Sequence, residues 1–147
     1  MSNETTKTRN ATAQTLWGIF LLFCGISIYL LFRSKTITIY RWCETIGATG
    51  IIDNLRHCVR HWAVPDFVRY SLPDGLYCAS YILIMDAIWR KGRKKARIVA
   101  VSLIPLAAIV HETLQGLGLA RGTFDFGDFL CYTVPLVTYL ILSRNSN

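Results

Sequence analysis

Residues 16–32 read LWGIFLLFCGISIYLLF, a run without a single charged side chain. A helix over residues 15–32 would be about 27 Å long, close to the thickness of the hydrocarbon core of a bilayer. Lys7 and Arg9 precede the run, as basic residues precede the apolar core of a secretory signal. However, the run ends in the bulky residues 29–32 and shows no cleavage site of small residues. We therefore expect a retained transmembrane anchor.

The remainder of the 147 residues repeats this pattern, and 52% of the whole chain is hydrophobic. Three more apolar blocks predict spans over 75–89, 98–119 and 129–142. The first and last of these three are short for a full crossing. The sequence thus predicts an all-α integral membrane helical bundle of about four transmembrane helices plus one amphipathic interfacial helix. Residues 1–14 would be a disordered cytoplasmic tail, and 15–147 a single membrane domain.

The interfacial helix is predicted over residues 51–62, where apolar side chains recur every three or four positions. These side chains are Ile51, Ile52, Leu55, Val59 and Trp62, and basic and polar residues fill the opposite face. Such a pattern is typical of a helix that lies flat in the membrane interface, but a helix packed against the bundle has it too. In the interface, Ile52, Leu55 and Val59 would be shielded from water, and Arg56 and Arg60 would reach the headgroups.

The net charge of +7 gathers most strongly in residues 90–97, six of which are Lys or Arg. In a soluble protein this excess would suggest nucleic acid, but the segment lies between two apolar blocks. It is therefore expected to be a cytoplasmic loop that faces anionic lipid headgroups, with no nucleic-acid partner. With four spans, both termini are then cytoplasmic, and the bacterial cytoplasmic membrane is the expected location. The loop between the first and second predicted spans, residues 33–73, is also basic, but its length of about forty residues weakens its influence on the predicted orientation.

One acidic residue lies near the basic end of the second predicted span. Asp86 precedes Arg90 by four residues, which on a continuous helix places the two side chains on one face. We expect a structural ion pair between them at the membrane surface.

A second group of polar side chains is expected at the outer face, where the four-span topology gathers the ends of three spans. Glu112 and Gln115 share one face of the third span, because they lie three residues apart. The expected site residues are Asp74, Glu112, Gln115, Arg121, Asp125 and Asp128. They form either a salt-bridge lock with Arg121 as its only cation or a site for a polar ligand. Four carboxylates exceed what a lock needs, which favours a site for a cation, an amine or a proton relay.

Motifs for catalysis and for metal or cofactor binding are not visible. The sequence shows no Gly-x-Ser-x-Gly elbow, Gly-rich phosphate loop or His-Glu-x-x-His pair, and none of its five cysteines forms Cys-x-x-Cys. His57 and His61 supply only two metal ligands between basic neighbours, so no metal site is predicted. Cys43 and Cys58 fall in one inter-span segment, where a disulfide is an open alternative. No catalytic residue and no cofactor are predicted.

The segment from Glu112 to Asp128 resembles the VanZ-like membrane proteins. That family shows Glu-x-x-Gln in one span, then an arginine and two aspartates three apart, matched here by Glu112, Gln115, Arg121, Asp125 and Asp128. The interval between the arginine and the first aspartate is one residue longer here, and Tyr132 stands where the family has asparagine. The resemblance implies an envelope protein of a family linked to teicoplanin resistance, without a settled reaction.

The first functional hypothesis is thus a cell-envelope membrane protein whose acidic outer cluster binds a polar envelope or exogenous ligand. A small membrane subunit of a channel, transporter or immunity complex, assembled with itself or with a membrane partner, is the alternative. A membrane enzyme that acts on lipid-linked substrates through its carboxylates is the second alternative.

Overall fold

The computed structural model describes residues 2–36 and 38–145. In this range the chain is helical and contains no strand, so the all-α prediction is confirmed. The helices are α1 (Ser2–Phe32), α2 (Thr38–Thr45), α3 (Thr49–Val59), α4 (Asp66–Tyr70), α5 (Leu72–Ile88), the short 3-10 helix η1 (Trp89–Lys91), α6 (Lys94–Gly116) and α7 (Phe126–Asn145).

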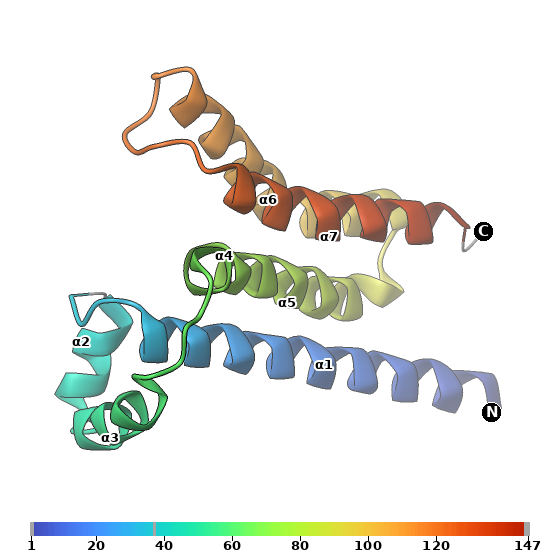
Figure 1. The fold of residues 1–147 in the computed structure, drawn as a ribbon. Coiled ribbons are helices and arrows are strands. Elements are labelled where there is room, and N and C mark those ends of the chain that lie inside the picture. Colours follow the sequence, from blue (N-terminus) through green and yellow to red (C-terminus); the bar gives the residue numbers. More distant parts are fainter. Residues whose placement is uncertain (1, 37, 146–147) are drawn as a thin grey trace.

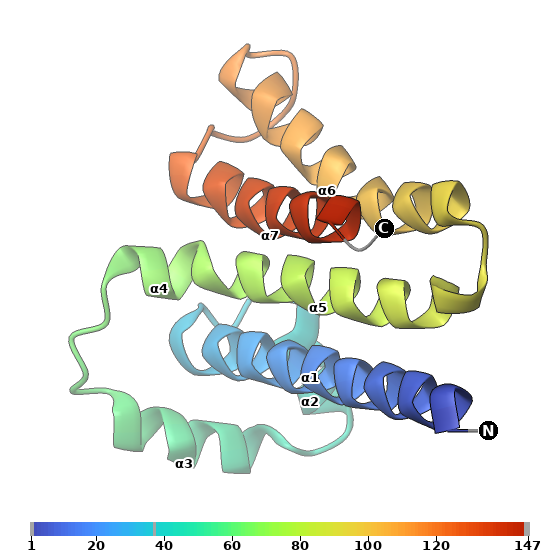
Figure 2. The same cartoon turned by 90° about the vertical axis from the view of Figure 1, so that its right-hand side faces the viewer.

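Helix α5 lies in the middle of the bundle, with α1 along one side and α6 and α7 along the other (Figures 1 and 2). It is apolar on nearly all sides, as a helix enclosed by other helices is expected to be. Its buried side chains are Pro73, Cys78, Ser80, Ile82 and Asp86. Cys78 and Ile82 form the core together with Val101 of α6 and Leu136 of α7.

Three helical segments are long and apolar enough to cross a membrane: Ala11–Phe32, Lys94–Gly116 and Phe126–Arg144. Many of their large apolar side chains point away from the protein, among them Trp17, Phe20, Phe23, Leu103, Leu106, Val137 and Ile141. Such a surface is unusual for a soluble monomer and is compatible with a membrane protein. The predicted second span corresponds to α5, which at 17 residues is shorter than the other three.

Most helix boundaries lie within a few residues of the predicted ones, with one large difference at the amino terminus. Helix α1 begins at Ser2, so the segment expected to be a disordered tail continues the first helix in the structure. A helix extends readily beyond an apolar core, because each added residue gains one hydrogen bond after the nucleus has formed.

The carboxyl end of α6 is set by a glycine. Gly118 has a φ of 71°. Its N–H donates to the carbonyl of Gln115 at 3.0 Å, and the N–H of Leu119 donates to that of Leu114 at 2.9 Å. This pair of bonds is a Schellman motif, which requires the left-handed backbone that glycine adopts easily. The helix therefore ends before residue 119, the predicted end of the third span.

Four long helices meet at the buried carboxylate of Asp86, which is 7% exposed. Gln14 of α1 donates to its Oδ2 at 2.8 Å, and the hydroxyl of Tyr139 of α7 donates to its Oδ1 at 2.8 Å. Arg97 of α6 completes the group, with its Nε 3.0 Å from Asp86 Oδ1. Since a buried charge needs both a counter-ion and hydrogen bonds, this contact ties α1, α6 and α7 to α5.

The predicted partner of Asp86 is therefore wrong: its counter-ion is Arg97, not Arg90. Helix α5 ends at Ile88 and continues as η1, so Arg90 does not lie one α-helical turn beyond Asp86. Instead the Arg90 guanidinium donates to the side-chain oxygen of Gln14, which places it in the outer part of the same network.

Helices α1 and α5 approach closely because glycines of α1 face α5. Gly18 and Gly25 are seven residues apart and buried. A Cβ at Gly18 would lie 2.7 Å from Ile84 Cγ1, and one at Gly25 would lie 2.8 Å from Tyr77 Cε1. Small residues at such an interface let two helices pack backbone to backbone, as is common in membranes.

The two candidate partners of Asp86 can be compared in a double-mutant cycle on the detergent-solubilised protein. Arg97→Gln should lower the free energy of unfolding by about 3 kcal/mol or more, because it leaves a buried carboxylate unpaired. Combined with Asp86→Asn, it should show a coupling energy of about 1 kcal/mol or more. Asp86→Asn and Arg90→Gln should show a smaller coupling energy, because Arg90 reaches Asp86 only through Gln14. A larger coupling with Arg90 than with Arg97 would contradict the structure.

The close contact between α1 and α5 predicts a penalty for adding volume at Gly25. Gly25→Leu should destabilise the protein by about 1–3 kcal/mol, the usual cost of overpacking. Gly50 of α3 is the control, since a Cβ there meets nothing within 4 Å. Gly50→Leu should be neutral or slightly stabilising, because leucine favours a helix more than glycine does. Equal melting temperatures for the two variants would rule out the contact.

Candidate functional site

The predicted site residues lie at one end of the bundle, which we call the loop end because the loop 117–125 closes it. Here α1 and α6 end, and α5 and α7 begin (Figure 1). The opposite end carries the basic segment 90–97. Antiparallel packing of successive long helices therefore brings together residues that are far apart in the sequence.

Three carboxylates come together at the loop end, and we call Asp74, Glu112 and Asp128 the acidic cluster. Asp74, half-buried in the first turn of α5, interacts electrostatically with both other carboxylates and with the hydroxyl of Tyr132. Glu112 is buried in α6, at 9% exposure. Asp128 lies in the first turn of α7, and its Oδ1 is buried without a hydrogen-bond partner. These three predicted residues therefore share one neighbourhood, contributed by three helices.

The other three predicted residues serve the loop. Gln115 donates from its amide to the backbone carbonyl of Arg121 at 3.0 Å. Asp125 precedes α7 and caps it, because its Oδ1 accepts the N–H of Gly127 at 2.7 Å. The N–H of Asp125 in turn donates to Glu112 Oε2 at 3.3 Å. The carboxylate of Asp125 is thus occupied with its own helix, and only its backbone reaches the acidic cluster.

The cation that accompanies the acidic cluster is not the predicted one. Arg121 is exposed on the loop, and no ion pair joins it to a carboxylate in the described part of the chain. Arg33, at the end of α1, interacts electrostatically with Asp74 instead. Its guanidinium carbon lies 4.8 Å from the ring centre of Tyr29 and 5.2 Å from that of Tyr70. A lock based on Arg121 is therefore not what the structure forms.

The position of Arg33 in the sequence could have indicated that it lies near the acidic cluster. Arg33 directly follows the first apolar block, so a four-span topology puts it at the same end as Asp74. Its electrostatic interaction with Asp74 depends on the packing of α1 against α5, which no local pattern specifies. Ring contacts with two tyrosines then hold the guanidinium in place, since aromatic faces attract cations.

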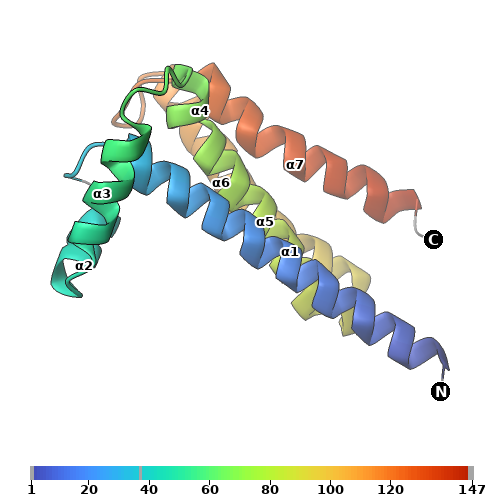
Figure 3. The ribbon, with the colours of Figure 1, turned by 60° about the horizontal axis from the view of Figure 1, so that its bottom comes forward.

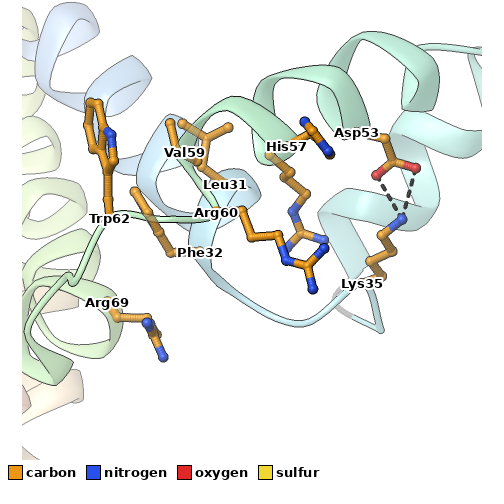
Figure 4. Close-up of a pocket in the computed structure, with 10 residues that line it drawn as sticks. Leu31, Phe32, Lys35, Asp53, His57, Val59, Arg60, Trp62 and Arg69 are labelled. Carbon is orange, nitrogen blue, oxygen red and sulfur yellow. Dashed lines mark hydrogen bonds and ion pairs between the residues drawn. The ribbon is translucent and has the colours of Figure 1, made fainter.

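A cavity of about 540 Å³ lies between the end of α1, helix α3 and helix α4 (Figure 4). We call it the basic pocket. Its lining residues are Leu31, Phe32, Lys35, Asp53, Arg56, His57, Val59, Arg60, Trp62 and Arg69. Sequence analysis assigned several of these residues to the polar face of an interfacial helix but predicted no cavity. Only the folding of α3 back toward α1 creates it.

Two of the four cations in the basic pocket have structural partners. Lys35 pairs with Asp53 at 2.8 Å, and the hydroxyl of Tyr40 donates to the same carboxylate at 3.0 Å. These two contacts hold the pKa of Asp53 below its ordinary value. Arg56 donates from Nε to the carbonyl of Leu30 at 2.8 Å and from Nη2 to that of Arg33. It thereby caps the end of α1, where the free carbonyls and the helix dipole favour a cation.

No group of three or more His, Cys, Asp or Glu side chains within residues 2–36 and 38–145 is placed to hold a metal ion. The carboxylates of the acidic cluster are thus near one another without forming a coordination shell. Cys43 and Cys58, for which a disulfide was open, are both free thiols in the structure.

Comparison with known proteins adds no relative: no family model, no curated protein and no solved structure matches the chain. The fold and sites define a helical protein with three membrane-capable helices. The resemblance to VanZ-like proteins stays a prediction.

The two arginines near the acidic cluster should differ in their effect on stability. Arg33→Gln should lower the free energy of unfolding by about 1–2 kcal/mol, through the loss of two cation–π contacts and of the positive charge facing Asp74. Arg121→Gln removes the same charge from an exposed side chain and should change stability by less than about 0.5 kcal/mol. Thermal unfolding of both variants in one detergent checks this. If Arg121→Gln lowers the free energy of unfolding more than Arg33→Gln does, Arg121 is the cation of a salt-bridge lock after all.

Proposed function

We propose that this chain is a four-span protein of the bacterial cytoplasmic membrane, with both termini in the cytoplasm. Its acidic cluster would bind a polar, positively charged ligand of the envelope or from outside the cell. The observation that carries the proposal is the unpartnered, buried Oδ1 of Asp128, beside the carboxylates of Asp74 and Glu112. Like charges in one partly buried place repel one another, and a cationic ligand would relieve that repulsion.

The fourth span would be α5. Its 17 residues correspond to about 26 Å of helix, slightly less than the hydrocarbon thickness. Helix α5 is enclosed by α1, α6 and α7, and each of these three helices is long enough to cross a membrane. This position supports the assignment of α5 as a span. A short helix enclosed by longer ones has little contact with lipid, so its length need not match the bilayer.

Helix α3 would lie in the membrane interface, as its exposed side chains suggest. Ile52 packs inside the protein, whereas Ile51 and Leu55 point away from it, with 70% and 52% exposure. This exposed stripe and Ile46 of the preceding turn form an apolar surface that lipid would cover. Together with α2, α3 turns away from the direction of α1 (Figure 3). Arg56, expected among the headgroups, instead binds the end of α1.

The orientation follows from the basic segment 90–97, which the positive-inside bias places in the cytoplasm. In a cysteine-free variant, a cysteine at the exposed Thr123 should react with a membrane-impermeant maleimide added to intact cells. One at the exposed Lys95 should react only after the membrane is opened. The opposite labelling would invert the topology and place the acidic cluster inside the cell.

The ligand site can be tested with two neighbouring acids at the start of α7. Asp128→Asn should keep or raise the melting temperature, because it relieves like-charge repulsion without emptying space. Asp125→Ala is the control and should cost about 1 kcal/mol, since it removes the helix cap.

Spermidine is a suitable cationic probe for the same variants. It should raise the melting temperature of the unmodified protein, since a ligand at about 100 times its Kd stabilises by about 2.7 kcal/mol. The shift should be lost in Asp128→Asn and kept in Arg121→Gln. Absence of any spermidine effect, or an equal effect in Asp128→Asn, would contradict a cation site. An envelope role would further appear as a higher inhibitory concentration of teicoplanin in bacteria that express the chain.

A further inference from the structure

The basic pocket carries more positive charge than its own structure uses. Lys35, Arg56, Arg60 and Arg69 line it against the single carboxylate of Asp53. Lys35 neutralises Asp53, and the guanidinium of Arg56 is bound to carbonyl oxygens. Arg60 and Arg69 make no ion pair among the residues that the structure describes. Two guanidinium groups therefore face one cavity without an anionic partner.

Arg69 is the clearer example of a guanidinium group without an anionic partner. Its Nε is buried and has no hydrogen-bond partner, although its guanidinium carbon lies 5.9 Å from the ring centre of Tyr70. A buried donor without an acceptor is costly, and most buried polar groups in proteins have a partner, either another protein group or ordered water. A phosphate would supply such an acceptor to Arg60 or to Arg69, because one guanidinium group binds two phosphate oxygens side by side.

The other wall of the basic pocket is apolar. Leu31 and Phe32 come from the end of α1, Val59 from the end of α3, and Trp62 from the turn that follows (Figure 4). A cavity that combines arginines with these apolar side chains matches a molecule with a phosphate and an apolar or glycerol-like part. Its volume of about 540 Å³ falls within the usual range of sites for small ligands.

We infer that the basic pocket binds a phosphate-bearing group, with Arg60 and Arg69 as the residues that hold the phosphate. Such a group occurs both in anionic phospholipid headgroups and in free phosphorylated molecules. The site is distinct from the acidic cluster, which has the opposite charge, and from the basic segment 90–97 at the other end of the bundle. It does not depend on the proposed cation site.

Binding can be measured as the ligand-dependent rise in melting temperature of the full chain in a neutral detergent. The probes are dihexanoyl phosphatidylglycerol, dihexanoyl phosphatidylcholine, glycerol 3-phosphate and inorganic phosphate. Phosphatidylglycerol should stabilise the protein at lower concentration than phosphatidylcholine, whose choline cancels the phosphate charge. If glycerol 3-phosphate is as effective as phosphatidylglycerol, the ligand is a free phosphorylated molecule. If only phosphatidylglycerol acts, the ligand is a lipid headgroup.

The variants Arg60→Gln and Arg69→Gln should each weaken the apparent affinity by about tenfold or more, because charge-assisted hydrogen bonds are lost. Arg60→Lys keeps the charge but loses the paired geometry and should give a smaller loss. Arg121→Gln and Lys95→Gln remove one positive charge elsewhere and should bind normally. The unfolding curve of each variant without ligand shows whether it is folded.

Two results would overturn the inference. One is that no phosphate-bearing probe stabilises the unmodified protein. The other is that Arg121→Gln and Lys95→Gln weaken binding as much as Arg60→Gln and Arg69→Gln, which would mean attraction to net charge alone. Asp128→Asn should leave phosphate binding unchanged. The experiment therefore distinguishes a failure of the phosphate site from a failure of the proposed cation site.

Discussion

A carboxylate inside an apolar bundle has to be satisfied from several sides at once, and for Asp86 three other helices do this. Gln14, Arg97 and Tyr139 reach it from α1, α6 and α7, respectively. Loss of any one of them would leave buried charge or hydrogen-bonding capacity unmet, so the contact specifies which helix faces lie inward. Apolar packing alone would allow many rotations of such helices, because both their inward and their outward faces carry large apolar side chains. The positions of both sites at the loop end follow from this arrangement.

The loop end contains two sites of opposite charge, and α1 connects them. Its last carbonyls accept hydrogen bonds from Arg56, which fixes α3 and thereby the basic pocket. Its first residue beyond the helix, Arg33, is the cation that interacts electrostatically with Asp74 of the acidic cluster. The capping arginine therefore separates the two sites and couples their positions.

Packing between helices explains where sequence analysis succeeded at the site and where it failed. Asp74, Glu112 and Asp128 were expected together, because a hairpin of two spans must return its polar ends to one side. The salt-bridge lock, one of the two alternatives for this cluster, assumed that Arg121 is near the carboxylates in space because it is near them in the sequence, and the structure shows no such ion pair in the described part of the chain. The partner of Asp86 was misjudged for a related reason: the i,i+4 rule holds only while the helix continues, and α5 ends at Ile88.

The sequence by itself determined the helical class of this protein, the approximate positions of its long helices and the end at which its acidic residues gather. These features depend on local composition and on the lengths of apolar runs, which are properties of a continuous stretch of chain. Only the tertiary structure decided that Arg97 pairs with Asp86, that Arg33 faces Asp74 and that α3 encloses a basic pocket. Each of these features combines residues from separate parts of the chain, and the rotation of one helix against another is set by side-chain packing across the interface. That information is distributed over the whole bundle, so no single segment of the sequence contains it.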